Sequence, residues 1–383
     1  MLQTHVQACS IPQWYSTFSS MTIRSIILPL PEAVVQYLHE DGITLPDLPP
    51  NVPVHPNDPR RPSTTDWSDD DDDEDDDDDD EETDDDGNKA AAVVPHCFPE
   101  FEAQITHAIA KLGGDVFPKL DWSSPRDAVF LKGGDLKCDN VGDIFLLLKG
   151  SDFCSHDLTH AYAHCAPSSS SSVTAAATAA AASSSSRHLV LRRWCNLYPS
   201  HEFRCIVRHN ALVGITQRHC DRYFQQLSND IDILTNVIDM FHQDTFLPAL
   251  LNSQHKTITK TFSDNLGKDY LYDVYVNRRH EVTLLDFNVN HPSSTDSKLF
   301  SWSELDNIDS EDEQEGKEDR LHSNSQQIDV RFVESQGEAV PSQLSAHRVP
   351  ADFVGDPAQF MEEFVDAQRR GDFNDGNDDT KGR

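Results

Sequence analysis

An unbroken run of acidic residues is the feature that most constrains this chain. Every residue from Asp69 to Asp86 is Asp or Glu except Thr83, so the run supplies 17 of the net 35 negative charges. The surrounding residues 45–96 are rich in Pro, Asp and Glu, with few apolar side chains whose burial could offset the loss of chain entropy. We therefore expect a disordered acidic loop at 45–96, after an ordered arm at 1–44.

A second low-complexity stretch divides the rest of the chain. Residues 166–186 are Ser and Ala apart from one Pro, one Val and two Thr, and we expect a flexible insertion there. It separates folded segments at 97–165 and 187–309. Residues 310–383 are expected to be a mostly polar tail, with a docking segment near 348–369.

The apolar patterns of the folded segments predict a mixed α+β protein. Helices are expected at residues 100–112, ended by Gly113-Gly114, and within 221–251, where apolar residues recur at spacings of three and four. Residues 141–148 are apolar enough to be a buried element of either type. Strands are expected at 22–31, 115–120, 128–131, 189–194, 202–208, 211–217, 270–276 and 284–288.

Oxygen-rich side chains gather on the expected hairpin of strands 270–276 and 284–288. Alternation places Asp286 and Asn288 on one face and Leu285 and Phe287 on the other. An antiparallel partner strand brings Asp273 near Asp286 and Asn288. Neither strand contains Lys or Arg, so the carboxylates repel each other unless a cation lies between them. Magnesium prefers such oxygen ligands. A hairpin with solvated acids is the alternative from these residues alone.

Basic side chains in other strands fit an anion, although each one taken singly fits surface charge. Lys119 follows apolar residues in its strand and either extends to solvent or meets an anion. Phosphate suits it, although neither of the two commonest phosphate-binding loop motifs is present. Arginine binds phosphate through a fork of donors. The arginines and their neighbours that could join a nucleotide-metal site are Arg192, Arg193, Glu202, Arg204 and Arg218.

Four other features bear on binding and compartment. Cys154, His156, His160, His164 and Cys165 have spacings compatible with zinc, or with compositional drift beside the Ser/Ala stretch. No Lys/Arg cluster supports nucleic-acid binding. No apolar segment is long enough for a membrane span. The eight cysteines include no CxxC pair and are interpreted as reduced thiols, so we expect a cytoplasmic protein. We also expect a monomer.

Short motifs in the same order as these segments resemble the cell division cycle protein 123 family. They cover nearly all the segments expected to be ordered and are therefore highly specific. The runs that carry the resemblance are Trp14-Tyr15, residues 22–31, Phe98-Pro99-Glu100-Phe101, residues 112–114, residues 117–123, residues 189–192, Glu202-Phe203-Arg204-Cys205 and Leu285-Asp286-Phe287-Asn288.

The resemblance implies an ATP-grasp fold, in which two α+β lobes with antiparallel sheets hold ATP and Mg²⁺ between them. Residues 97–165 and 187–309 would be the two lobes. Members of the family are assembly chaperones that bind the C-terminal region of the gamma subunit of eukaryotic translation initiation factor 2 and promote its union with the alpha subunit. The implied magnesium ligands are Asp273, Asp286 and Asn288. The implied ATP-binding residues are these three with Lys119, Asp121, Trp122, Arg192, Arg193, Trp194, Cys195, Glu202, Arg204 and Arg218.

The chain departs from the family pattern at three places. Residues 289–295 replace a usual Pro-Phe-Gly turn, Asp121 stands where Asn is frequent, and His219 stands where Asp is usual. Two other functions compete with the assembly chaperone. One is an ATP-dependent ligase or kinase with an unknown acceptor, and the other is an acidic chaperone of histone type that binds through residues 69–86.

Overall fold

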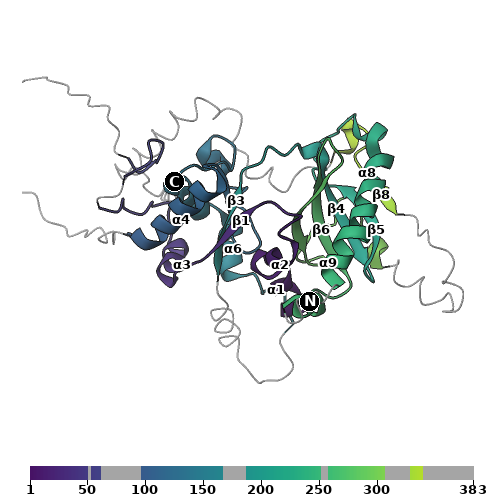
Figure 1. The fold of residues 1–383 in the computed structure, drawn as a ribbon, viewed down its shortest axis with the longest axis horizontal. Coiled ribbons are helices and arrows are strands. Elements are labelled where there is room, and N and C mark those ends of the chain that lie inside the picture. Colours follow the sequence, from purple (N-terminus) through teal and green to yellow (C-terminus); the bar gives the residue numbers. More distant parts are fainter. Residues whose placement is uncertain (51–52, 62–95, 167–186, 252–257, 307–327, 340–383) are drawn as a thin grey trace, which may run out of the picture.

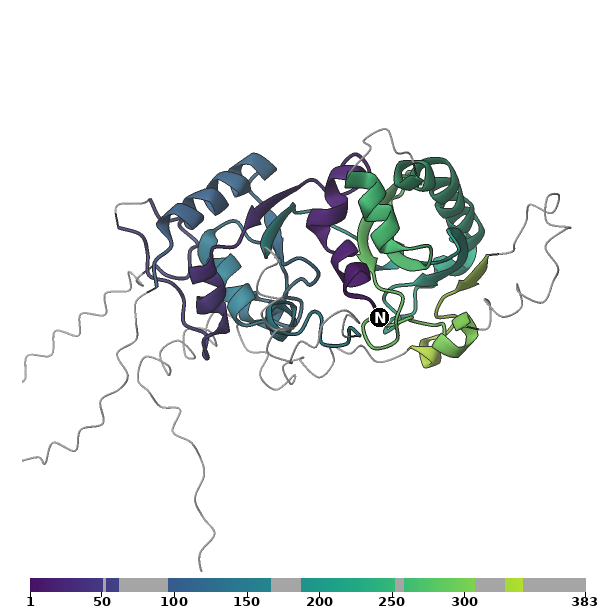
Figure 2. The same ribbon diagram turned by 90° about the horizontal axis from the view of Figure 1, so that it is seen from below.

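Two sheets, each covered by helices, make up the part of the chain that the structure describes. The structure is a computed structural model and describes residues 1–50, 53–61, 96–166, 187–251, 258–306 and 328–339. The sheets lie side by side, and the N-terminal helices α1 (Gln3–Ala8) and α2 (Ile11–Phe18), drawn in purple, lie between them in both views (Figures 1 and 2). The region between the two sheets is therefore where side chains from distant parts of the sequence meet.

The smaller sheet has three antiparallel strands in the order β1-β3-β2. They are β1 (Ser25–Pro29), β2 (Val116–Lys119) and β3 (His188–Arg193). Leu189 and Leu191 of β3 pack among its helices, while Val190 and Arg192 point the other way. We call this sheet and its helices the first lobe. Its helices are α3 (Glu32–His39), α4 (Pro99–Leu112), α5 (Val141–Lys149) and α6 (Asp152–Thr159).

The larger sheet has five strands in the order β7-β6-β4-β5-β8 and forms, with its helices, the second lobe. Only the β5–β8 pairing is parallel. The strands are β4 (Glu202–Arg208), β5 (Ala211–Gln217), β6 (Tyr270–Val276), β7 (Val282–Asn288) and β8 (Asp329–Arg331). Its helical elements are α8 (Leu227–Phe241), the π-helix η3 (His242–Phe246), α9 (Leu247–Leu251) and α10 (Ile258–Leu266).

Alternation along the strands gives the larger sheet one apolar and one polar face near its centre. Phe203 of β4 and Tyr272 of β6 are buried in a core that also includes Trp14 and Phe18 of α2. The residues between them, Arg204 and Asp273, belong to the opposite face. The N-terminal arm therefore completes the core of the second lobe.

Two apolar stretches of the first lobe form helices. Residues 128–131 were expected to be a strand, but Val129–Lys132 is a short 3₁₀ helix, η1. The stretch lies between Pro125 and Gly133-Gly134, and Leu131 N–H bonds the Ala128 carbonyl instead of another strand. Residues 141–148, left open by their pattern, lie in α5, whose N-terminus is capped by Asn140 accepting from Asp143 N–H at 2.8 Å.

A bulge changes the facing of side chains in β7. Val274 pairs with Leu284 and Asp273 pairs with Asp286, so Leu285 is an extra residue on its strand. Phe287 packs in the second-lobe core, whereas Leu285 lines the space between the lobes beside Asp286. The prediction that Leu285 and Phe287 share a face is therefore wrong.

Parts of the expected acidic loop 45–96 and of the expected polar tail 310–383 are described and packed. Residues 53–61 belong to the expected loop 45–96, and there Arg60 forms ion pairs with Asp58 at 2.9 Å and Glu102 at 3.0 Å. In the expected tail, β8 joins the larger sheet and is followed by the short 3₁₀ helix η4 (Gln336–Glu338). The acidic run 69–86, residues 167–186 and the segment 348–369 lie outside the described residues.

The cysteines and the helices of the described part can be compared with what the sequence predicted. All eight cysteines are free thiols. None of the helices in the described ranges combines the length and the apolar composition that a membrane span requires.

Candidate functional site

Three charged side chains lie in a row across the larger sheet. The strand register places Arg204 of β4 opposite Asp273 of β6, and Asp273 opposite Asp286 of β7. Arg204 donates two hydrogen bonds to the Asp273 carboxylate, from Nε at 2.8 Å and from Nη2 at 2.9 Å. Because one planar guanidinium binds both carboxylate oxygens of Asp273, the geometry of the Arg204–Asp273 pair is fixed.

Asp273 is the most enclosed acid of the row, being 1% exposed. Arg218 Nε lies 3.1 Å from its Oδ2, and Asn288 Nδ2 donates to the same oxygen at 3.2 Å. Burial alone would raise the pKa of the Asp273 carboxyl. The Arg204 and Arg218 guanidiniums outweigh burial, so this pKa lies well below its usual value. Asp273 is therefore a permanent negative charge at neutral pH.

Asp286 forms an ion pair with Lys119 of β2, and this pair joins the two lobes. Burial lowers the pKa of the Lys119 ammonium, while the charge of Asp286 raises it. The carboxylates of the hairpin are thus balanced by cations from β2, from β4 and from just after β5. The argument that only a metal ion could offset their repulsion is wrong, because it considered only the two strands that carry the acids.

Arg192 of β3 makes a further connection between the lobes. Its side chain is 3% exposed and donates to the Leu285 carbonyl at 2.8 Å and to Thr22 Oγ1 at 3.0 Å. Burial lowers the pKa of this guanidinium. Arg193, the next residue along the strand, points to the opposite face and is exposed.

An apolar cavity of about 320 Å³ opens between the lobes. Phe117 and Trp194 face its interior from the first-lobe side, with ring centroids 6.3 Å apart and planes near perpendicular. Leu285 lines it from the second lobe. Aromatic and aliphatic side chains that share a cavity lining with polar and charged groups suit a ligand that has a flat ring system and polar substituents. The other apolar residues that line the cavity are Ile23, Leu136, Cys195 and Leu197.

A polar cavity of about 280 Å³ adjoins it. It extends from Trp122 and Ser123 past Arg204 to the loop after β7. Five residues line both cavities, so the two cavities meet where these residues lie. Three of the five are cations, and one is Asp286, the partner of Lys119. The shared residues are Lys119, Ser124, Arg126, Arg218 and Asp286. We call the two cavities together the cleft.

Comparison with known proteins shows the family to which this chain belongs. The sequence profile of the D123 family matches residues 14–356. The chain belongs to the D123 family. This confirms the resemblance to the cell division cycle protein 123 family. The solved structure of Cdc123 from Schizosaccharomyces pombe is similar to this one, with a TM-score of 0.57 and 28% sequence identity, covering 88% of this chain and 99% of that chain.

Similar proteins from animals and an amoeba share one name, translation initiation factor eIF2 assembly protein. The Xenopus tropicalis protein is 33% identical over 377 residues, covering 96% of this chain and 98% of its own length. The Danio rerio protein is 36% identical over 383 residues, covering 96% and 95%. The Dictyostelium discoideum protein is 34% identical over 374 residues, covering 90% of each chain.

The structure of this D123-family chain brings most of the expected site residues to the cleft. Lys119, Arg218 and Asp286 line both of its cavities. Asp273 lies beneath Arg204 and Arg218 instead of lining either cavity. The expected residues that line only one cavity are Arg192, Trp194, Cys195 and Glu202 in the apolar cavity, and Trp122, Arg204 and Asn288 in the polar one.

Two expected site residues do not line the cleft. The carboxylate of Asp121 accepts hydrogen bonds from His188, from the backbone N–H at 3.2 Å and from Nδ1 at 3.0 Å. It therefore fixes the start of β3. Arg193 is on the outer face of the same strand. Neither side chain lines a cleft cavity in this structure.

Arg126 is a cleft cation that the sequence did not reveal. Enclosure by the cleft walls, and then repulsion by Arg218, lowers the pKa of its guanidinium to about 10, although solvent reaches the side chain. Among the described residues it has no ion-pair partner. A single Arg in a polar loop gives no signal of such a position.

Asp157 was also missed, and it positions the loop before Arg126. Its carboxylate accepts from the backbone N–H groups of Trp122 at 3.2 Å and Ser123 at 2.6 Å, and from Ser123 Oγ at 2.8 Å. Burial raises the pKa of Asp157 to about 6. The only hint in the sequence was its place between His156 and His160.

The oxygen atoms of Asp273, Asp286 and Asn288 suit Mg²⁺, but two present contacts of these side chains would have to change for the ion to bind. Asp286 and Asp273 are opposite each other on adjacent strands, and Mg²⁺ commonly takes one or two carboxylates and completes its shell with water and phosphate. Asp286 would have to exchange Lys119 for the ion, and the Asn288 amide would have to turn its oxygen toward it. In the described ranges no three His, Cys, Asp or Glu side chains are grouped to hold a metal ion.

The histidines expected as zinc ligands line the polar cavity without forming such a group. His156 and His160 stack with ring centroids 5.8 Å apart, and His164 lies on the same wall. Cys154 is buried, and burial raises the pKa of its thiol well above the usual value. A thiol that stays protonated is a poor zinc ligand.

Proposed function

We propose that this chain is an ATP-Mg²⁺-binding assembly chaperone for eukaryotic translation initiation factor 2, with the ATP-grasp arrangement of two lobes around the nucleotide. In this proposal it binds the C-terminal region of the gamma subunit and promotes its union with the alpha subunit. The observation that carries the nucleotide part is the cleft, where an apolar cavity adjoins a cationic, oxygen-rich one. The shared name of the similar proteins supports the partner.

The side chains of the cleft match the parts of ATP. The apolar cavity beside Phe117 and Trp194 suits the base, and Glu202 in its lining could meet the ribose. Phosphate oxygens would be held by the cations that both cavities share. Asp286, Asp273 and Asn288 would hold the metal ion, which neutralises phosphate charge and links the triphosphate to the second lobe.

The Lys119–Asp286 pair is consistent with a site awaiting this ligand. Among the described residues neither member forms a second ion pair, and each would gain a stronger partner from bound nucleotide, phosphate for Lys119 and Mg²⁺ for Asp286. Nucleotide would therefore replace the direct contact between the lobes by a contact through the ligand. We infer that this changes how firmly the lobes are held together and so prepares the surface that receives the gamma subunit.

Titration calorimetry tests the nucleotide part. We expect ATP with Mg²⁺ to bind the wild-type chain, and Asp286→Ala to remove the magnesium-dependent part of the affinity. Asp232→Ala is the matched control, because Asp232 is an exposed acid on α8, away from the cleft. Unchanged ATP affinity in Asp286→Ala would refute the metal assignment, and no ATP binding by the wild type would refute the site.

Capture of purified subunits tests the partner. The immobilised chain should retain the gamma subunit, and a gamma subunit lacking its C-terminal region should pass through. Repeating the capture with and without ATP-Mg²⁺ shows whether nucleotide supports binding. Failure to retain the full-length gamma subunit under both conditions would contradict the proposal.

One observation favours an ATP-dependent ligase or kinase as the alternative function. The polar cavity continues beyond Asp286 to Ser293, Ser294 and Thr295, which leaves space for an acceptor next to the proposed phosphates. No cysteine lines this cavity except Cys9, whose thiol pKa is raised by burial. Steady ATP turnover that depends on an added acceptor would favour the enzyme over the chaperone.

A further inference from the structure

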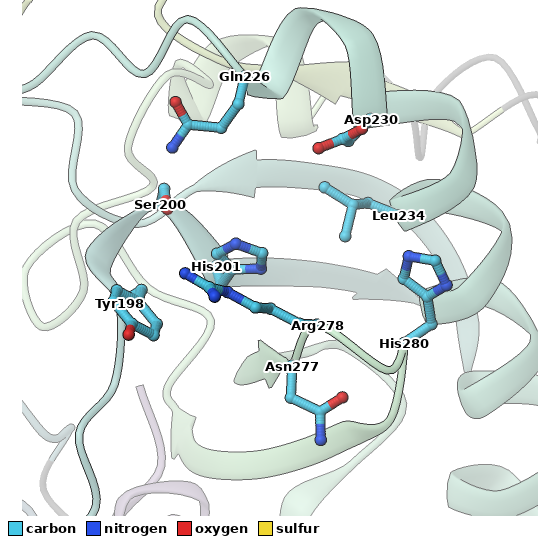
Figure 3. Close-up of a pocket in the computed structure, with 9 residues that line it drawn as sticks. All are labelled: Tyr198, Ser200, His201, Gln226, Asp230, Leu234, Asn277, Arg278 and His280. Carbon is cyan, nitrogen blue, oxygen red and sulfur yellow. The ribbon is translucent and has the colours of Figure 1, made fainter.

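A third cavity, of about 430 Å³, lies in the second lobe and shares no lining residue with the cleft. Figure 3 shows that three separate segments surround it: the approach to β4 with the 3₁₀ helix η2 (Pro199–His201), the first half of α8, and the turn between β6 and β7. Its lining residues are Tyr198, Ser200, His201, Gln226, Asp230, Leu234, Asn277, Arg278 and His280. Nothing in the proposed nucleotide site uses it.

The turn that forms one wall is held in place before any ligand arrives. Asn277 Oδ1 accepts from the N–H groups of Arg279 at 2.8 Å and Glu281 at 3.0 Å, and Asn277 Nδ2 donates to Glu281 Oε2 at 2.7 Å. His201 Nδ1 donates to the Val276 carbonyl at 2.8 Å, which ties η2 to the end of β6. A wall fixed in this way loses little conformational entropy when it binds.

Arg278 is a cation without an acidic partner at this wall. Its guanidinium lies 5.0 Å from the centroid of the Tyr198 ring, a cation–π contact that leaves the N–H donors available. Among the described residues no carboxylate pairs with it. Arg278 is exposed, so these donors can meet an acidic group from outside the chain.

The remaining groups favour an oxyanion on the Arg278 side of the cavity. Figure 3 shows Gln226, His201 and Arg278 around the same cavity, so an amide and an imidazole line it together with the guanidinium. Asp230 faces the cavity from α8 and disfavours an anion close to that helix. The ligand group is thus expected near the β6–β7 turn.

A protein segment fits this cavity better than a free small molecule. Tyr198 is 50% exposed and Arg278 is also exposed, although each packs against the other. Tyr and Arg are the side chains that most often dominate the binding energy of protein interfaces, because they combine a large contact area with directed hydrogen bonds. We propose that this cavity is a docking site for a partner protein, which inserts an Asp or Glu side chain against Arg278.

The chain offers a matched pair of variants for the test. Arg278 and Arg279 are adjacent in the same turn and carry the same charge, but only Arg278 lines the cavity. The probe is a blocked peptide of alternating Glu and Ala residues, titrated into the full chain at about 0.15 M salt, where screening suppresses loose attraction between surface charges. Binding is followed by the NMR signals of the histidine rings and quantified by fluorescence anisotropy of a labelled copy.

We expect the peptide to shift the ring signals of His201 and His280 and to bind at least five times more weakly to Arg278→Ala. Arg279→Ala should bind within a factor of two of wild type, and Asp230→Asn should bind more tightly, because an opposing charge is removed. The matched Gln-Ala peptide should not bind. Equal loss in the two arginine variants, or shifts confined to histidines of the cleft, would overturn the proposal. So would the absence of binding by the Glu peptide. None of these outcomes depends on whether the cleft binds ATP.

Discussion

At the scale of single residues, the cleft depends on charges that balance one another across large distances in the sequence. Lys119 and Asp286 are 167 positions apart and come from different lobes, yet their side chains are only 6% and 16% exposed. Removing one member of such a pair leaves the other charge enclosed without a partner. Removing both can cost little, because the desolvation penalty is removed as well.

The Lys119–Asp286 pair gives the first prediction. Asp286→Ala should lower the free energy of unfolding by about 2–4 kcal/mol, since the Lys119 ammonium is left enclosed and unpaired. The double variant Lys119→Met with Asp286→Leu should recover most of this loss. Urea unfolding of the three proteins measures the difference. Equal losses of unfolding free energy in the single and double variants would show that side-chain packing, rather than the unpaired Lys119 ammonium, determines the loss of stability.

Asp157 gives a prediction about pH. Its folded-state pKa of about 6 lies above the usual value for Asp, near 3.9, so between about pH 4 and pH 6 the folded chain holds a proton that the unfolded chain has released. The free energy of unfolding should therefore fall as pH rises through this window, by about 2–3 kcal/mol from this group.

Comparison with Asp157→Asn isolates this contribution. The variant has no carboxyl at this position, so its free energy of unfolding should lack the part of the pH dependence between pH 4 and 6 that Asp157 causes. The difference between the two proteins, from urea unfolding at several pH values, removes the effect of all other groups. A difference that does not change with pH would contradict the raised pKa.

At the scale of elements, the sequence predicted those whose signal is local. The spacing of apolar residues in α4 and the glycine after it were sufficient, because Gly113 ends the helix with a φ of 107°, which favours glycine. The turn between β4 and β5 is also local, with His209 and Asn210 both at positive φ. In contrast, the bulge at Leu285 leaves no mark in the composition of the strand. Strict alternation therefore placed Leu285 on the same face as Phe287, which is wrong.

A contact between α5 and the segment before the acidic run gives an element-scale prediction. A Cβ placed on Gly142 would lie 2.2 Å from Asp58 Oδ1 and 2.8 Å from Pro59 Cδ. Gly142→Ala should therefore displace residues 53–61 and lower the free energy of unfolding by about 1–3 kcal/mol. Gly337→Ala is the control, because open space surrounds Gly337. Equal thermal stability of the two variants would contradict this packing.

At the scale of the whole molecule, the N-terminal arm belongs to both lobes. Its strand β1 pairs with β3 in the first lobe, whereas Thr22 Oγ1 donates to the Leu284 carbonyl of the second lobe at 2.7 Å. The sequence alone could supply the acids of the site but not their partners. The cations that balance Asp273 and Asp286 come from other strands, and only the register and the approach of the two lobes bring them together.

The acidic run provides the prediction that separates the competing functions of the whole chain. Deleting residues 69–86 removes 17 acidic side chains and changes the net charge from −35 to −18. The run is separate in sequence from every residue that lines the cleft. The proposed function assigns nucleotide binding to residues of the cleft and gamma-subunit binding to the folded lobes. It therefore predicts that ATP affinity and capture of the gamma subunit stay within about twofold of wild type at about 0.15 M salt, where screening weakens the general field of the run.

A chain in which the same 18 positions are Gly and Ser controls for loop length, because both altered chains lack the charge but only one lacks the spacer. An acidic chaperone of histone type requires the opposite result: capture of a basic partner would fall steeply in both altered chains and would weaken with added salt in the wild type. Loss of gamma-subunit capture in both chains, with ATP affinity intact, would move the binding function from the folded lobes to the acidic run.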